Sequence, residues 1–339
     1  ELSVTAYTCG DLIQQPTLLN AAEQALGYIL SETSQLPVVG IVGMPITYGN
    51  ALYNCAVVFA EGRIRGVVPK TYIPNYAEFY EARCFMSGEE IGFATIRMCG
   101  QETDFGRNIL FNLDGVKFGV EICEDMWVPA APSVNQAVDG AQVLFNLSAS
   151  PEVIGKHNYL LSLVKSQSAR TQSAYVYCSA GYGESSTDLV FAGNGIIVEG
   201  GQILQRSERF SLEEQLVVAD IDTERLITSR RRTTTFAPHR PNERIIVEIS
   251  LPKNPADTTL DRWIDPQPFV PGSPEEMEEC GNEIVNIQTM GLAQRLEHTN
   301  CKKVVLGVSG GLDSTLALMI AVRTFDRLGL NRKGIIAVT

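Results

Sequence analysis

An apolar run ends in a cysteine at Val116-Lys117-Phe118-Gly119-Val120-Glu121-Ile122-Cys123, directly after an Asp114-Gly115 turn. The run predicts a strand, and the apolar stretch from Ala141 to Ser148 predicts another strand that is buried on both faces. Helical spacing of apolar residues follows from Asn158 to Thr171. Strands that alternate with helices indicate an α/β protein, either with one mixed sheet or with two such sheets packed together.

Further strand-like runs lie on both sides of this stretch. The first of them are separated by turn residues at Gly49-Asn50 and Glu61-Gly62, as expected for hairpins. The additional strands that we expect are residues 38–44, 55–60, 63–68, 176–180, 195–199, 202–206 and 216–220. Hairpins together with helical crossovers favour a mixture of antiparallel and parallel pairing.

The composition excludes several classes of protein. The 339 residues include 27 Lys and Arg against 39 Asp and Glu, and a net charge of −12 argues against nucleic-acid or anionic-membrane binding. Apolar stretches fall short of the ~18 residues that a membrane span needs. The 8 cysteines form no C-x-x-C pair, which argues against a zinc site and for a reduced, cytoplasmic protein. We interpret Arg230-Arg231-Arg232 as a solvated face or a partner contact.

The chain changes character near residue 250. Prolines recur through residues 251–272, which we expect to form a semi-rigid linker between a first domain, 1–250, and a second, 273–339. The second domain opens with a helix, because Ser273 suits the N-cap, Pro274 the first helical position and Glu276 a capping box.

A phosphate-binding turn is predicted at Val304-Val305-Leu306-Gly307-Val308-Ser309-Gly310-Gly311-Leu312-Asp313-Ser314. Two glycines between a strand and a helix let the backbone approach a ligand closely, and the helix start offers free N–H groups to an anion. A second strand from Gly334 to Val338 completes the opening βαβ unit of a doubly wound parallel sheet. The turn lacks the Lys that precedes Ser or Thr in a Walker A loop.

Three reactive residues stand out in the first domain. Cys123 ends its strand, Lys70 follows an apolar run in Val67-Val68-Pro69-Lys70-Thr71-Tyr72, and Glu1 opens the chain. A thiolate attacks an amide carbon, a carboxylate transfers protons, and an ammonium stabilises the developing oxyanion. A further carboxylate, Glu78 or Glu81, is a candidate to support the lysine, and we favour Glu81.

These two constellations resemble two known families. Glu1, Lys70 and Cys123 resemble the Glu–Lys–Cys triad of the nitrilase superfamily, whose α-β-β-α sandwich is the fold that we therefore expect for the first domain. The turn resembles the S-G-G-x-D-S signature of the ATP pyrophosphatases. By this resemblance Gly307, Val308, Ser309, Gly310, Gly311, Leu312, Asp313 and Ser314 bind ATP, and Asp313 holds Mg²⁺ on the phosphates; no flavin, PLP or zinc is implied.

Joined in one chain, the two motifs are similar to the glutamine-dependent NAD synthetase family. The similarity extends through Glu1–Leu12, Pro69–Tyr76, Val120–Trp127, Gly183–Leu189, Asp261–Pro266 and Leu306–Ser314. It implies that glutamine is hydrolysed at the first site and that ammonia passes through a tunnel to the second. There nicotinic acid adenine dinucleotide is adenylated by Mg-ATP and amidated to NAD, in an enzyme expected to be a homo-oligomer.

The same resemblance supplies candidates for glutamine binding, which are Tyr7, Tyr76, Phe79, Glu124, Ser150 and Lys156. Lys156 departs from the arginine expected at its place, and lysine lacks the two-pronged geometry that suits a carboxylate. Trp127 is either a core residue or a wall of the substrate pocket.

The ends of the chain lead to a further expectation. Glu1 is not preceded by Met, and the chain stops just after an apolar run. By the family pattern we expect a strand and a helix before Glu1 and roughly 200 or more residues after Thr339, the size of a further domain. Two other functions stay open: a different carbon–nitrogen hydrolase or amidotransferase, and an inactive fragment that serves as a scaffold.

Overall fold

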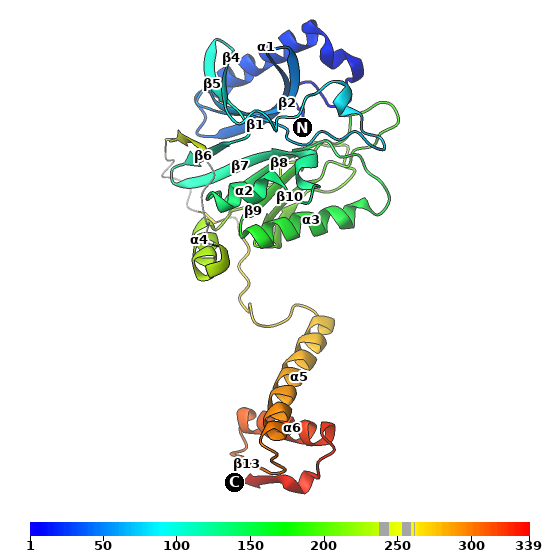
Figure 1. Cartoon of the computed structure of the whole chain (residues 1–339), viewed down its shortest axis with the longest axis vertical. Helices are drawn as coiled ribbons and strands as arrows, with labels where there is room; N and C mark the ends of the chain where they lie inside the picture. The colour runs from blue at the N-terminus through cyan, green and yellow to red at the C-terminus, as the bar shows by residue number, and fades with distance from the viewer. Residues whose placement is uncertain (237–243, 253–258, 261) are drawn as a thin grey trace. The chain divides into compact units, whose positions relative to one another are not determined.

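The computed structural model describes residues 1–236, 244–252, 259–260 and 262–339. Within them the chain forms two compact units, Glu1–Arg262 and Trp263–Thr339 (Figure 1). Part of the expected linker, including Pro255, and Asp261 of the family motif lie outside the described residues.

A five-stranded sheet forms one layer of the first unit. Its strands lie in the order β1-β2-β3-β5-β4, with antiparallel pairing except between β3 and β5. Their bounds are β1 Val39–Tyr48, β2 Ala51–Ala60, β3 Arg63–Pro69, β4 Ala94–Met98 and β5 Gln101–Phe105. Helix α1, Pro16–Glu32, packs Ala22, Leu26 and Leu30 against this sheet, because residues four apart share one helix face.

A seven-stranded sheet forms the second layer, in the order β11-β10-β9-β8-β7-β6-β12. Strands β7, β8 and β9 pair in parallel and are joined by helices, as crossover connections require. The bounds are β6 Ile109–Leu113, β7 Val116–Ile122, α2 Pro132–Val138, β8 Val143–Ser148, α3 Lys156–Thr171, β9 Ala174–Ser179, β10 Gly195–Glu199, β11 Gln202–Arg206, α4 Thr223–Arg232 and β12 Ile245–Ile249.

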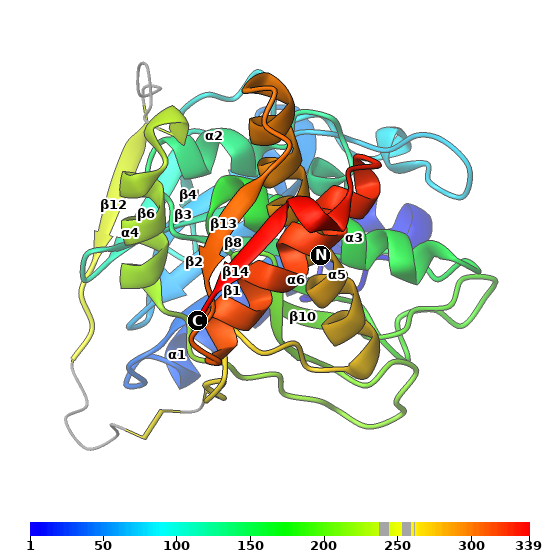
Figure 2. The ribbon, with the colours of Figure 1, turned by 90° about the horizontal axis from the view of Figure 1, so that it is seen from below.

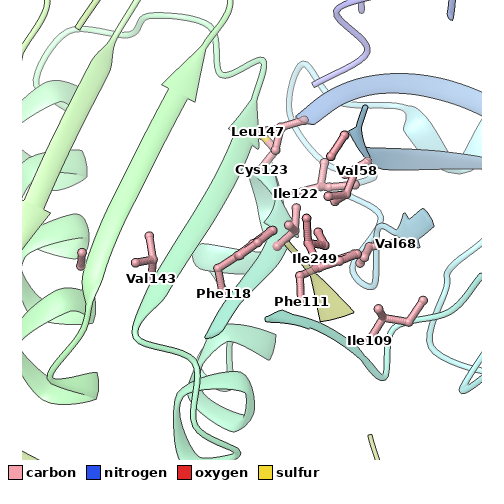
Figure 3. Packing of buried hydrophobic residues seen from close by; sticks show 14 of the residues in the cluster. Val58, Val68, Ile109, Phe111, Phe118, Ile122, Cys123, Val143, Leu147 and Ile249 are labelled. Atoms are coloured by element: carbon pink, nitrogen blue, oxygen red, sulfur yellow. The ribbon is translucent and has the colours of Figure 1, made fainter. Parts of the chain in front are cut away.

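The main core lies between the two sheets. Residues Ala56, Val58 and Ala60 of β2 face this core, whereas the alternate residues Cys55, Val57 and Phe59 face α1. Both sets are buried, which explains why β2 reads as a continuous apolar run. Figure 3 shows how side chains of the second sheet, such as Phe111 and Phe118, meet those of the first.

The layers of the first unit therefore run helix, sheet, sheet, helix, with α1 on one side and α2 and α3 on the other (Figure 1). This confirms the predicted α-β-β-α sandwich.

Two local predictions are wrong. Residues 216–220 form no strand, and Leu216 is 89% exposed. In the arginine run, Arg231 and Arg232 are exposed as predicted, but Arg230 is half-buried, because its guanidinium donates to main-chain oxygens that include those of Ala141 and Thr171.

The second unit contains the predicted βαβ unit. Strand β13, Val304–Gly307, pairs in parallel with β14, Ile335–Val338, and α6, Leu312–Arg327, connects them (Figure 2). Helix α5, Pro274–His298, precedes them and packs against α6. Its N-cap is Ser273, whose side chain accepts a hydrogen bond from the Glu276 N–H at 3.1 Å, as predicted. No helix in the described parts of either unit is long and apolar enough to cross a membrane.

Candidate active site

Three strands of the first unit end at one place. Lys70 directly follows β3 of the five-stranded sheet, Cys123 directly follows β7 of the seven-stranded sheet, and Ala149 directly follows β8. The Lys70 N–H donates to the main-chain oxygen of Asn54 at 2.8 Å, which holds the end of β3 against β2. The two sheets thereby bring residues that are distant in sequence to a common edge.

A lysine between two carboxylates forms the centre of this site. Lys70 Nζ lies 2.7 Å from Glu1 Oε1 and 2.7 Å from Glu81 Oε1, and none of the Lys70 side chain is exposed. Glu1 also accepts hydrogen bonds from the Asn54 side-chain amide at 2.6 Å and from the Ala149 N–H at 3.1 Å. The tyrosine hydroxyl of Tyr7 donates to Glu81 Oε1 at 2.8 Å.

These contacts set the protonation of the three groups. Burial alone disfavours charge on Lys70, but the two carboxylates outweigh it and raise the pKa of its ammonium. Burial likewise works against the ionised form of Glu1, yet Lys70 holds its pKa below the ordinary value. Burial and the charge of Glu1 raise the pKa of Glu81 to about 7. Glu81 is thus the carboxylate of the pair that titrates near neutral pH.

Cys123 occupies a constrained position beside these groups. Its backbone φ is +43°, a conformation that costs a residue with a side chain free energy, and only 3% of it is exposed. Burial and the negative charge of Glu1 raise the pKa of the Cys123 thiol to about 12. The resting thiol is therefore protonated, and a nearby proton acceptor is needed to form the thiolate.

Asp125 ties the lysine segment to the cysteine segment, and the sequence alone did not point to it. Its buried carboxylate accepts hydrogen bonds from the N–H groups of Thr71 at 3.1 Å, Tyr72 at 2.8 Å and Ile122 at 3.0 Å. One side chain thus fixes the backbone after Lys70 and the backbone before Cys123. Its place two residues after a candidate nucleophile was the available signal.

Asn54 and Glu184 were also missed. Asn54 is a polar residue inside an apolar strand, which is a signal for a buried hydrogen bond, and its side chain binds Glu1. Glu184 lies in the family motif Gly183–Leu189, and its carboxylate accepts a hydrogen bond from the Tyr7 N–H at 2.6 Å.

The candidate glutamine-binding residues divide into two groups. Tyr76, Phe79, Glu124 and Lys156 lie together: the Tyr76 hydroxyl donates to Glu124 at 2.9 Å, and Lys156 Nζ lies 5.7 Å from the Phe79 ring centre. Lys156 Nζ also lies 5.3 Å from the ring centre of Trp127, which packs against a buried core cluster as well, so both interpretations of Trp127 stay open. The Tyr7 hydroxyl instead contacts Glu81. Ser150 is buried, and its N–H donates to the Ser179 hydroxyl at 3.3 Å.

The candidate ATP-binding turn lies in the second unit. Gly310 has φ +82°, and Gly311 is the N-cap of α6, with no side chain bonded to the first N–H groups. The Ser309 and Ser314 hydroxyls lie 3.3 Å apart. Asp313 is exposed in the first turn of α6, where an oxygen ligand can face phosphates. In the described parts of both units, no group of three or more His, Cys, Asp or Glu side chains could hold a metal by itself.

A family match agrees with this fold. Residues 1–231 match the carbon–nitrogen hydrolase family, and residues 284–338 match the NAD synthase family. The chain belongs to the carbon–nitrogen hydrolase family.

Curated relatives narrow this class. The chain is 44% identical to the glutamine-dependent NAD(+) synthetase of Mycobacterium tuberculosis H37Rv over 347 residues, which covers 99% of the chain and 51% of the relative. It is 29% identical to the glutamine-dependent NAD(+) synthetase of Aquifex aeolicus, with 99% of the chain and 53% of the relative covered. The predicted resemblance is confirmed, and the chain spans about half the length of these relatives.

Solved structures show the same fold. A glutamine-dependent NAD(+) synthetase from Cytophaga hutchinsonii matches with a TM-score of 0.59 at 22% identity, covering 96% of the chain and 45% of that structure. The enzyme of the same name from Acinetobacter baumannii, in complex with ADP, matches with a TM-score of 0.54 at 23% identity, covering 99% of the chain and 51% of that structure.

Proposed function

We propose that the first unit hydrolyses glutamine with Cys123 as the nucleophile. The observation that carries the proposal is the Lys70 ammonium, held between two carboxylates at the strand ends where Cys123 lies. Glu1 takes the thiol proton as the sulfur attacks the carboxamide carbon, and Lys70 stabilises the negative charge on the oxygen. Glu1 returns the proton as the C–N bond breaks and ammonia leaves. Water then hydrolyses the thioester with Glu1 as base, which gives glutamate and restores the thiol.

The residues around Lys156 are proposed to hold the amino-acid end of glutamine. Lys156 offers a positive charge to the α-carboxylate, and Glu124 offers a negative charge to the α-ammonium group. Tyr76 and Phe79 supply a T-shaped pair of rings with centres 5.7 Å apart, which suits the aliphatic part of the substrate. Ser150 is proposed to contact the substrate from the end of β8.

The second unit is proposed to begin an ATP pyrophosphatase. Backbone N–H groups from Gly307 to Ser314 suit the ATP phosphates, because a positive φ at Gly310 and the free start of α6 present donors to an anion. Asp313 would hold Mg²⁺, which neutralises phosphate charge when it is bound. The substrate to be adenylated is nicotinic acid adenine dinucleotide, and pyrophosphate leaves.

The activity of the whole protein follows from joining the two sites. We infer that ammonia passes through an internal tunnel to the adenylate and displaces AMP, which forms NAD. The match of residues 284–338 to the NAD synthase family supports the assignment of NAD formation to the second unit. The eight cysteines are all free thiols, which favours a reducing, cytoplasmic setting. Assembly into a homo-oligomer stays a prediction, and the mass of the intact protein in solution tests it.

The test is Cys123→Ala in the intact protein that carries this chain. We expect loss of NAD formation from glutamine and retention of NAD formation from added ammonia, because only the first site is damaged. Cys280→Ala, an exposed cysteine of α5, is the matched control and is expected to behave as wild type.

Each alternative has its own outcome in this test. Use of glutamine by Cys123→Ala overturns the assignment of the nucleophile. Release of pyrophosphate with another carboxylic acid, but not with nicotinic acid adenine dinucleotide, identifies a different amidotransferase. If the wild type neither uses glutamine nor releases pyrophosphate, the remaining interpretation is an inactive fragment that serves as a scaffold.

A further inference from the structure

The segment that follows Glu1 is held in an unfavourable backbone conformation. Ala6 has φ +74°, in the left-handed region where a residue with a Cβ atom loses about 1–2 kcal/mol. This turn directs the next two backbone N–H groups, those of Tyr7 and Thr8, toward one point. Successive N–H groups that converge in this way form a site for an anion.

The anion at that point is the carboxylate of Glu184. Its Oε1 accepts hydrogen bonds from the Tyr7 N–H at 2.6 Å and from the Thr8 N–H at 2.9 Å. The Thr8 hydroxyl also donates to the main-chain oxygen of Glu184. Hydrogen bonds to a charged acceptor are the stronger kind, so Glu184 offsets the cost of the Ala6 conformation.

Tyr7 continues this line of contacts into the site. Its hydroxyl donates to Glu81 Oε1 at 2.8 Å, and both oxygens of Glu81 accept from Lys70 Nζ, at 2.7 and 2.8 Å. Glu184 is thus two contacts away from the carboxylate that supports the lysine. Without Glu184 the turn at Ala6 would relax, and the Tyr7 hydroxyl would leave Glu81.

We propose that Glu184 is a positioning residue for the glutaminase site, which acts by holding Tyr7 so that its hydroxyl fixes Glu81 on Lys70. This proposal rests on the proposed function. It gives a role to the motif Gly183–Leu189, which the reaction steps leave without one. A side-chain acceptor oxygen at residue 184 is required, because it must face the N–H groups of Tyr7 and Thr8 at once.

The first experiment compares three variants of the intact protein in glutamine hydrolysis. Glu184→Ala is expected to lower kcat about 10- to 100-fold, the size of loss that follows small displacements of reacting groups. Glu184→Gln retains an oxygen that accepts from the same donors and is expected to keep most of the activity. Asp188→Asn removes a charge from an exposed residue of the same segment and is expected to match wild type.

A second readout separates positioning from a loss of folding. The Tyr7 hydroxyl favours the ionised form of Glu81, so its departure raises the pKa of Glu81 further. Glu184→Ala and Tyr7→Phe are both expected to move the low-pH limb of kcat to higher pH, and the double variant is expected to show no additional shift. An unchanged limb in Glu184→Ala overturns the proposal, as does equal loss in Glu184→Gln.

The substitution Ala6→Gly tests the backbone argument. Glycine adopts the Ala6 conformation without the Cβ penalty, so Ala6→Gly is expected to restore part of the kcat that Glu184→Ala loses. If the wild type does not hydrolyse glutamine, the proposed function fails. The pH dependence of Cys123 alkylation then decides the proposal, which requires Glu184→Ala, and not Glu184→Gln, to change it.

Discussion

Lys70 Nζ lies 2.7 Å from Glu1 Oε1, and neither side chain has any exposed surface. Taking two charges out of water costs free energy, and their attraction offsets it only where hydrogen bonds satisfy the remaining donors and acceptors. Asn54 and Ala149 supply those donors to Glu1, and Glu81 supplies the second acceptor to Lys70. The pair therefore depends on its surroundings as much as on its own contact.

Removing the ammonium should leave two buried carboxylates facing each other. We expect Lys70→Met to lower the free energy of unfolding of the first unit by about 3–5 kcal/mol at pH 8, the usual cost of leaving a buried charge without its partner. The loss should shrink at acid pH, where the carboxylates take up protons. Chemical denaturation at several pH values measures this, with exposed Lys165→Met as the control. Equal loss at both extremes of pH would show that packing, not charge, is responsible.

Glu81 should impose a pH dependence of its own. Its pKa in the folded protein, about 7, lies above the ordinary value of 4.5, so the folded state binds the proton more tightly than the unfolded state. This contribution to stability is fully present below pH 4.5 and is lost as the pH rises through 7. We expect the unfolding free energy of wild type, minus that of Glu81→Gln, to fall across this window. A flat difference would contradict the raised pKa.

The same titration should appear in catalysis. Ionised Glu81 supports the ammonium of Lys70, so the kcat of glutamine hydrolysis by wild type is expected to rise as the pH passes 7. Glu81→Gln is expected to be less active and to lack this rise. If kcat still rises through pH 7 in Glu81→Gln, another group is responsible for this pH dependence.

The thiol of Cys123 should react as a protonated group. With a pKa raised to about 12 by burial and by Glu1, the thiolate fraction grows about tenfold with each pH unit from 7 to 10. Alkylation of Cys123 by iodoacetamide is expected to follow this slope, when it is measured by mass spectrometry of the labelled peptide. Exposed Cys280 in the same sample reports the activity of the reagent. A plateau near pH 8 would mean that Lys70 already holds a thiolate.

Sequence patterns located the reactive groups but not the groups that hold them. Cys123 and Lys70 follow apolar runs, and such runs predict strand ends, where side chains of different strands meet. Asp125 binds the N–H group of Thr71, 54 positions earlier in the sequence, and Glu184 binds that of Tyr7, 177 positions earlier. No local spacing encodes such a contact, because it exists only once the two segments are folded against each other.

Fold predictions were correct where the signal is local in the sequence, and they were wrong where the outcome depends on a distant partner. Strand β2 and the βαβ unit carry their own periodicity and turn residues, so local sequence suffices for them. Residues 216–220 have the composition of a strand, but pairing needs a partner with a free edge, and composition does not show one. The burial of Arg230 was unpredictable for the same reason, because its acceptors are main-chain oxygens near the ends of α2 and α3, far away in sequence.

The glycines of the second unit offer a matched pair of substitutions. Gly310 has φ +82° in the candidate phosphate turn, so Gly310→Ala should strain the turn by about 1–2 kcal/mol and weaken ATP binding. Gly291 lies inside α5, where an added Cβ meets no other atom within 4 Å, so Gly291→Ala should stabilise the helix by about 1 kcal/mol without affecting ATP binding. Calorimetric titration with Mg-ATP and thermal unfolding distinguish the two. Equal ATP affinity in both variants would show that the turn at Gly310 is not part of the nucleotide site.

The Arg230 guanidinium donates to the main-chain oxygens of Ala141 at 2.6 Å and Thr171 at 3.1 Å, among others. Burial lowers its pKa to about 10, which still leaves it charged at neutral pH. Arg230→Ala should cost about 2–3 kcal/mol of unfolding free energy, because the main-chain oxygens of the buried residues Ala141 and Thr171 lose this charged donor. Arg231→Ala, at the exposed neighbouring residue, should change it by about 0.5 kcal/mol or less. Urea denaturation of both variants measures these changes. Equal losses of unfolding free energy would mean that Arg230 contributes no more to stability than an exposed arginine.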